Sequence, residues 1–116
     1  MPHYGFERLA TVLPRCWSTA TSPQWTAVNP ARGQCNVTAL LVHALHGGDI
    51  LKTLVPGGWH FYNRIDGCRH DLTASQFDTP VDYADVGSSR EEALAGTKAE
   101  RYDALLRAVE PVLAGT

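Results

Sequence analysis

The sequence predicts an α+β fold in which one helix packs on a small antiparallel sheet. An apolar stripe at helical spacing runs from residue 35 to residue 46, two runs of β-forming residues follow it, and a second helical stripe lies near the C-terminus. Because 116 residues are too few for two independent cores, we expect a single domain over residues 1–116.

The N-terminal part of the chain is expected to contain one short helix and one long loop. Apolar residues recur at helical spacing from Tyr4 to Leu13, and Pro14 limits how far a regular helix continues. From Ser18 to Gly33, prolines and small polar residues predict an irregular segment. A loop of this length in a compact domain often carries function.

The central helix is expected from Cys35 to His46, with an amphipathic stripe that ends at Gly47-Gly48. Near the C-terminus, Thr97 and Glu100 have the spacing of a capping box. The apolar stripe that follows them predicts a terminal helix of about four turns.

Three antiparallel strands are expected between these helices, at Ile50 to Val55, Trp59 to Ile65 and Cys68 to Leu72. Asp66-Gly67 is typical of a two-residue hairpin turn, which pairs Ile65 with Cys68. Side chains alternate between the two faces of such a hairpin. The more apolar face is expected to meet the core, and it carries Trp59, Phe61, Ile65, Cys68 and Leu72.

The opposite face of the hairpin carries His60 and Asp71 as diagonal neighbours, so the sheet must be covered on both sides. We expect the start of the Cys35 helix to lie over the His60 end and another helix to cover the second face.

Composition excludes several classes of protein. The chain has 10 Lys and Arg against 12 Asp and Glu, a formal charge of −2, so a nucleic-acid interface is not expected. Its apolar runs are far shorter than the ~18 residues of a membrane span, and the N-terminus lacks the apolar region of a secretory signal. We therefore expect a cytoplasmic protein. Three cysteines, without a CxxC pair, predict neither a disulfide framework nor a zinc ribbon.

One cysteine has a setting suited to chemistry. Cys35 follows Gly33-Gln34 at the expected start of a helix, where unpaired N–H groups and the helix dipole favour a thiolate and could hold an oxyanion. His60 and Asp71 lie close enough across the hairpin for a hydrogen bond. The three residues together match the nucleophile, base and orienting carboxylate of thiol acyl transfer.

Other residues are weaker candidates. Trp25 and Tyr62 are expected to line a substrate cleft near the nucleophile, although aromatic residues more often belong to a core. No cofactor is indicated, because Gly57-Gly58 lacks the strand-to-helix setting of a phosphate-binding loop. The expected partner is a small-molecule or peptide substrate, and the oligomeric state stays open.

Several spaced motifs carry a resemblance to a known family. They are residues 31–35, Thr38 to Val42, residues 60–64 and Asp71-Leu72-Thr73 with Gln76-Phe77. Over about Trp17 to Val109 they resemble the YunG-like family of small bacterial proteins.

The order of a helix-borne Cys, a strand His and then an Asp is also similar to papain-like and transglutaminase-like cysteine enzymes. That resemblance implies a papain-like core with Cys35 as nucleophile, His60 as base and Asp71 as orienting residue. It also implies an oxyanion-binding glutamine, for which Gln34 is the candidate. The chain is much shorter than those enzymes, and Asn36 stands where Trp follows the cysteine.

Three functions follow from these residues. The first is a small cysteine hydrolase or acyl transferase acting on an amide, ester or thioester. The second is a binding module without catalysis, which holds its ligand near Trp25 and Tyr62. The third is a zinc site built from Cys35, His60 and Asp71, although no second Cys or His has the usual spacing.

Overall fold

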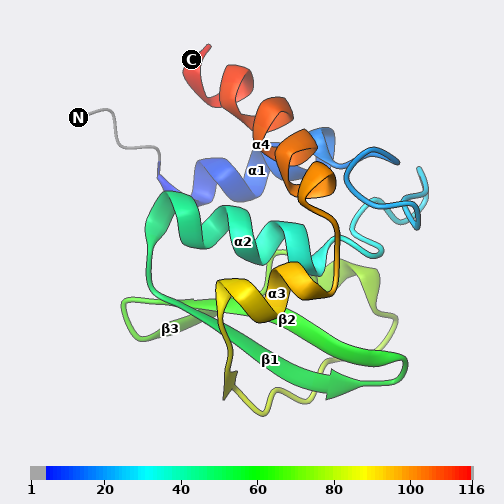
Figure 1. Ribbon diagram of the computed structural model, residues 1–116, viewed down its shortest axis with the longest axis vertical. Coiled ribbons are helices and arrows are strands. Elements are labelled where there is room, and N and C mark those ends of the chain that lie inside the picture. The colour runs from blue at the N-terminus through cyan, green and yellow to red at the C-terminus, as the bar shows by residue number, and fades with distance from the viewer. Residues whose placement is uncertain (1–4, 116) are drawn as a thin grey trace.

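The computed structural model describes residues 5–115, which form an α+β fold with the helices on one side of a sheet (Figure 1). The α-helices are α1 (Phe6–Cys16), α2 (Cys35–His46), α3 (Arg90–Ala95) and α4 (Ala99–Ala114). The strands are β1 (Asp49–Val55), β2 (Gly58–Ile65), β3 (Cys68–His70) and β4 (Val86–Gly87), and a 3₁₀ helix, η1, spans Ala74–Gln76. The α+β class predicted from the sequence is thus confirmed.

Helix α2 has the predicted bounds but is not amphipathic. Its six residues from 37 to 42 are all buried, because the sheet covers one side of the helix while α3 and α4 contact it on others (Figure 1). A helix that is enclosed in this way buries apolar side chains all round rather than along one stripe. It is therefore the central element of the fold.

Helix α1 continues beyond Pro14 to Cys16, further than predicted. Proline lacks an N–H and so removes one hydrogen bond near the end of the helix. The N–H of Trp17 still reaches the carbonyl of Leu13 at 3.1 Å, so the last turn stays closed. Tyr4, the predicted first residue, lies outside the described residues.

The C-terminal part contains α3, which we did not predict, and a corrected start for α4. Ser89 caps α3 by accepting a hydrogen bond from the N–H of Glu92, a Ser-x-x-Glu pattern visible in the sequence. Thr97 does not cap α4 but lies at the end of α3, where its N–H donates to the carbonyl of Leu94. The N-cap of α4 is Lys98, without a side-chain cap, and the helix has 16 residues, as long as predicted.

Two apolar clusters hold the helices and the sheet together. The larger cluster lies among α1, α2 and α4 and includes Leu13, Leu41 and Leu105. The smaller cluster joins α2 and α3 to the sheet through Leu40, Phe61 and other buried residues. Burial of these side chains supplies the main free energy that holds the helical layer on the sheet.

The sheet has the order β3-β2-β1-β4, one strand more than predicted. The predicted register of the hairpin is confirmed for the pairs from Ile65–Cys68 to Asn63–His70, but β3 ends at His70 and not at Leu72 as predicted. Strand β4 was not predicted, because it has only two residues and pairs with β1 from a distant part of the chain.

The two faces of the sheet are covered differently. On the α2 face, Phe61 is buried as expected, but Trp59 is 47% exposed and Cys68 is also exposed, since they lie near the ends of the hairpin strands. The other face is covered by the irregular segment 71–85 and not by the helix we predicted. Hydrogen bonds hold this segment on the sheet. For example, the Thr53 hydroxyl donates to the carbonyl of Asp82 and accepts from the N–H of Ala84.

No helix among residues 5–115 is long and apolar enough to cross a membrane.

Candidate active site

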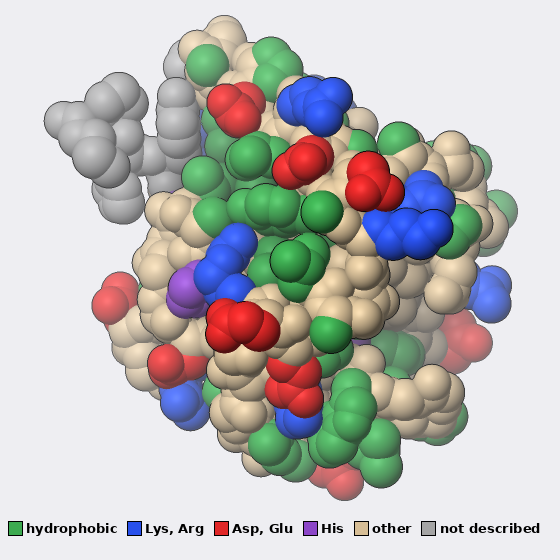
Figure 2. All heavy atoms as spheres, viewed as in Figure 1, with side chains coloured by type: hydrophobic (Ala, Val, Ile, Leu, Met, Phe, Trp, Pro, Cys, Tyr) green, Lys and Arg blue, Asp and Glu red, His purple; other side chains and the backbone are tan. Residues whose placement is uncertain are grey.

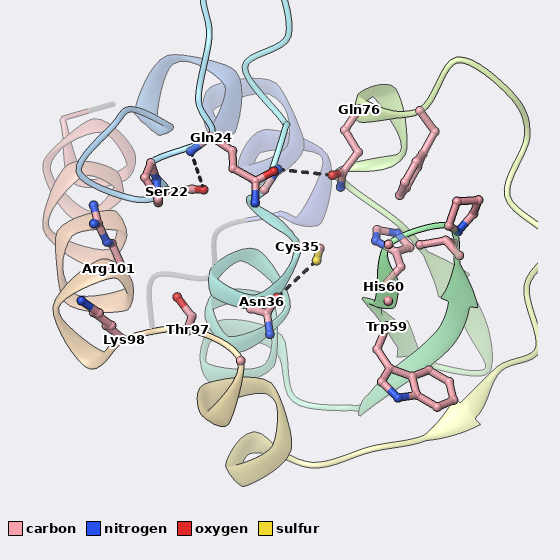
Figure 3. Close-up of a pocket in the computed structure, with 18 residues that line it drawn as sticks. Ser22, Gln24, Cys35, Asn36, Trp59, His60, Gln76, Thr97, Lys98 and Arg101 are labelled. Carbon is pink, nitrogen blue, oxygen red and sulfur yellow. Dashed lines mark hydrogen bonds between the residues drawn. The ribbon is translucent and has the colours of Figure 1, made fainter.

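A cavity of about 490 Å³ opens where the start of α2 meets the β1–β2 turn, the loop before α2 and the start of α4. Cys35 and His60 both line it. Figure 3 shows their side chains pointing toward one another from α2 and β2. The cavity thus gives access to two of the three residues that the sequence analysis selected.

The loop before α2 sets the position of Cys35. Gly33 has a φ of +74°, and a Cβ there would lie 2.5 Å from Ser22 Oγ and 2.9 Å from Gln24 Cβ. Only glycine fits this left-handed conformation and close approach. The helix that follows has no side-chain cap, so its first N–H groups point toward the cavity end of the helix without a capping partner.

The imidazole of His60 is 1% exposed and is held by a carboxylate. Its Nε2 lies 2.6 Å from Oδ2 of Asp71, the contact that the hairpin register predicts. The Phe77 ring packs edge-on against the imidazole, with centroids 4.8 Å apart. Among residues 5–115, Nδ1 of His60 has no hydrogen-bond partner, so it is the ring nitrogen left for an interaction with Cys35.

Asp71 is itself oriented by three further donors. Its Oδ1 accepts hydrogen bonds from the N–H of Thr73 at 3.2 Å and from the Thr73 hydroxyl at 3.3 Å. Its Oδ2 accepts from the Tyr83 hydroxyl at 2.8 Å. Because the carboxylate is almost fully buried, these bonds compensate for the water it has lost. They also hold it as an acceptor for the imidazole.

The charge state of His60 follows from these neighbours. Burial lowers the pKa of the ring, but the hydrogen bond to Asp71, the interaction with the Cys35 thiol and the charges of both groups outweigh it. Together they raise the pKa of His60 from 6.5 to about 9. The ring is therefore an imidazolium at neutral pH, beside the sulfur of Cys35.

The three cysteines occupy different environments. Cys35 is half-buried, and its Sγ lies 3.3 Å from Oδ1 of Asn36. Cys16 is buried, its thiol donates to the carbonyl of Ala108 at 3.7 Å, and burial raises its pKa. Cys68 is exposed on the hairpin. Of the three, only Cys35 combines access to the cavity with a neighbouring histidine.

The structure does not place three other predicted residues at the cavity. Gln34 is fully buried and turned away, with Oε1 accepting from the Thr21 hydroxyl at 2.7 Å. Tyr62 is 1% exposed and donates to Asp85 on the covered face of the sheet. Trp25 packs against the larger apolar cluster. Gln34 therefore anchors the loop, Tyr62 belongs to the interior, and Trp25 is half-buried against the larger cluster.

Other residues, which sequence reasoning missed, line the cavity instead. Gln24, Trp59 and Phe77 contribute polar and aromatic groups, and Lys98 and Arg101 contribute positive charge (Figure 3). The two basic residues come from the start of α4, more than sixty positions after Cys35. No local pattern in the sequence links them to the nucleophile, because only the packing of α4 brings them near.

The arrangement does not suit a zinc ion. Asp71 binds the nitrogen of His60 directly, so the carboxylate, the imidazole and the thiol lie in a row rather than around one centre. In the part of the chain that the structure describes, no group of three or more His, Cys, Asp or Glu side chains could hold a metal ion.

Comparison with known proteins gives a family. Residues 5–114 match the family model described as "YunG protein". "Uncharacterized protein YunG" of Bacillus subtilis (strain 168) is 44% identical over 102 residues, which cover 88% of this chain and 89% of that protein. No solved structure matches the chain at a significant level. The match over nearly the whole sequence confirms the resemblance seen in the motifs, and the chain belongs to the YunG family.

Proposed function

We propose that this protein is a cysteine-dependent hydrolase or acyl transferase that acts on an amide, ester or thioester through Cys35. The observation that carries the proposal is the row of three side chains at the cavity. Cys35 lies beside the ring of His60, whose other nitrogen is held 2.6 Å from Asp71. These are the roles of nucleophile, base and orienting group in thiol acyl transfer.

The first half of the reaction forms an acyl-enzyme. The Cys35 thiolate attacks the carbonyl carbon, a C–S bond forms, and the carbonyl electron pair moves onto oxygen. When the tetrahedral intermediate collapses, the bond to the leaving group breaks and the leaving group takes the proton from Nδ1 of His60. The geometry supports this assignment, because Nε2 is already occupied by Asp71.

The second half restores the enzyme. Water, or another nucleophile in a transferase, gives its proton to Nδ1 of His60 and attacks the thioester carbon. The C–S bond then breaks, Cys35 leaves as the thiolate, and His60 is again an imidazolium. Asp71 keeps the proton of Nε2 in place throughout and stabilises the positive ring.

The oxyanion would be stabilised by the start of α2. This helix has no side-chain cap, so its first backbone N–H groups are donors at its positive end. Gln24 lines the same cavity and takes the place in this proposal that the sequence analysis gave to Gln34. The buried bonds of Gln34 leave it no route to the substrate.

We also infer that the fold is a reduced papain-like core. In support of this, the nucleophile begins a central helix, the base lies on a strand of the adjoining antiparallel sheet, and the carboxylate follows the next strand. The rest of the chain would serve to enclose that unit.

The proposal is tested by alkylation of the cysteines with iodoacetamide, followed by mass spectrometry between pH 5 and pH 9. At pH 6 we expect Cys35 to react at least tenfold faster than exposed Cys68, and Cys16 to stay protected by burial. In His60→Ala the advantage of Cys35 should be lost, since the imidazolium that stabilises the thiolate is gone.

A second variant controls for the possibility that His60→Ala misfolds. Asp71→Asn keeps the size of the side chain but removes the charge that supports the imidazolium, so it should lower the pH 6 rate of Cys35 in a folded protein. Circular dichroism would verify that both variants fold. The proposal is wrong if Cys35 reacts no faster than Cys68 in the wild type, or if its rate is unchanged in both variants.

A further inference from the structure

The cavity at Cys35 has two chemically different ends. Figure 3 shows Lys98 and Arg101 on one side, Trp59 on the other, and Cys35 between them. The Phe77 ring also lines the cavity, next to the His60 imidazole. Within the described chain, no Asp or Glu lines this cavity.

The two cations carry charge that no carboxylate in the described residues neutralises. Lys98 is exposed and forms no ion pair there, and Arg101 uses one nitrogen, Nη1, for the neutral carbonyls of Thr19 and Ala20. An arginine has five N–H donors, so others stay available to a ligand. By contrast, Lys52, Arg64 and Arg69 each pair with a carboxylate.

The acidic residues near these cations on α4 do not neutralise their positive charge. Glu100 and Asp103 are exposed, line no part of the cavity and pair with neither cation in the described structure. The chain as a whole has a formal charge of −2, so the positive charge in the cavity is a local feature. Because Lys98 and Arg101 line a cavity that has no carboxylate among the described residues, the potential at their end favours an anion.

The other end of the cavity is apolar and open. Trp59 is 47% exposed, with Leu54 beside it on the neighbouring strand at 66%. Figure 2 shows hydrophobic side chains gathered over this end of the β1–β2 hairpin. Lys52 lies over the Trp59 ring at 4.2 Å, but its charge is paired with Glu92. A ligand that reaches this end would therefore meet apolar surface.

We propose that the substrate of Cys35 carries an anionic group that binds Lys98 and Arg101, and an apolar group, across the reacting carbonyl, that contacts Trp59 and Phe77. This inference rests on the proposed function, since it assumes that the carbonyl reacts at Cys35. The polarity of the cavity does not depend on that assumption. It follows from the unpaired cations at one end and the aromatic rings at the other.

The first test compares two p-nitrophenyl esters of equal length, the glutarate monoester and the valerate, which differ by a carboxylate in place of a methyl group. We expect the wild type to prefer the glutarate in kcat/KM. Lys98→Gln should reduce kcat/KM for the glutarate several-fold, and Lys98→Gln/Arg101→Gln by about tenfold, while the valerate changes less than about twofold. The preference should also weaken in high salt, because Lys98 is exposed and Arg101 is only half-buried.

Two variants serve as matched controls. Arg107→Gln removes the same charge from an exposed position of α4 that does not line the cavity, so the preference should persist. Arg101→Lys keeps the charge but alters the hydrogen bonds to the carbonyls of Thr19 and Ala20. It therefore distinguishes the contribution of the positive charge from that of the bonds that anchor the loop. A loss of preference in Arg107→Gln equal to that in Lys98→Gln would overturn the inference.

The apolar end is tested separately by Trp59→Ala, with Val28→Ala, exposed but away from the cavity, as its control. A several-fold loss of kcat/KM for the valerate is expected only in Trp59→Ala. No loss would overturn that half of the inference.

A second readout does not need turnover. We would measure the rate at which 3-maleimidopropionate and N-propylmaleimide alkylate Cys35, relative to Cys68 in the same chain. The anionic reagent should be favoured at Cys35, and Lys98→Gln/Arg101→Gln should reduce that preference. If neither ester is cleaved in a manner that depends on Cys35, the proposed function fails. The inferred polarity fails if the reagent preference is the same in wild type and double variant.

Discussion

The two faces of the sheet are covered in opposite ways. The face toward α2 is covered by helices through apolar contacts, with Phe61 packed against Leu40. The other face is covered by segment 71–85, which forms hydrogen bonds to the sheet side chains of Thr53, His60 and Tyr62. Apolar burial tolerates small displacements, whereas a hydrogen bond requires a defined geometry.

This difference explains where the candidate site lies. Cys35 comes from the helical layer, while His60 and Asp71 come from the side that segment 71–85 covers. The site forms where the two layers meet at one end of α2. We therefore expect substitutions in the helical layer to act mainly on stability, and substitutions in the polar network to act on the reactivity of Cys35.

The largest effect is expected from Leu41→Ala in the helical layer. Leu41 is fully buried in the larger cluster, so the substitution should lower the free energy of unfolding by about 3 kcal/mol, through lost burial and a cavity. Urea denaturation would measure the change. Leu54→Ala, at an exposed position, should change it by less than about 0.5 kcal/mol. Equal effects of the two would refute the assigned core.

The pH dependence of stability tests the polar side. The pKa of His60 is raised from 6.5 to about 9 in the folded protein, so the folded state holds this proton more tightly than the unfolded chain. The resulting stabilisation is complete below pH 6.5 and is lost as the pH rises through 9. It amounts to about 3 kcal/mol at most, measured by urea denaturation at pH 6 and pH 9.5.

Two variants show which groups cause this pH dependence. Asp71→Asn should reduce it strongly, because the hydrogen bond to the carboxylate is the leading contribution that raises the pKa of His60. Cys35→Ser should reduce it less. The pKa of Tyr62 is raised to about 12, mainly by burial, so this group does not titrate in the same range. A stability that stays constant from pH 6 to pH 9.5 would contradict the assigned His60 environment.

A smaller effect is expected from Tyr83→Phe. The substitution removes one of the donors to Asp71 and should cost about 1 kcal/mol, while Thr73 and His60 still hold the carboxylate. The pH 6 alkylation rate of Cys35 should fall slightly. Arg69→Gln, which breaks an exposed pair with Asp85, should shift the urea midpoint least, and high salt should remove the shift.

Much of the local structure could be predicted from the sequence. The bounds of α2 follow from its apolar run and the two glycines after it, and the hairpin register follows from the two-residue turn. That register alone placed His60 and Asp71 within hydrogen-bond distance. Each of these features depends on neighbours in sequence or on one ladder of strand pairs, so local rules suffice for them.

The errors share one cause. Gln34 and Tyr62 are polar residues near the site in sequence. Their side chains, however, form hydrogen bonds away from the cavity, Gln34 with Thr21 and Tyr62 with Asp85. Whether a polar side chain faces a cavity or fastens a loop depends on partners many positions away. Nothing in the local pattern distinguishes the two cases. The same holds for segment 71–85, which covers a face where a helix was expected.

The sequence by itself therefore determined the α+β class, the central helix, the hairpin and the candidate row of Cys35, His60 and Asp71. Tertiary structure alone decided what surrounds that row. It brought Lys98 and Arg101 from α4 to the cavity and Tyr83 to the carboxylate. The physical reason is the distance along the chain between the residues involved. Turns, helix caps and hairpin ladders are set by residues close in sequence, whereas a cavity and its charges arise only when distant elements pack together.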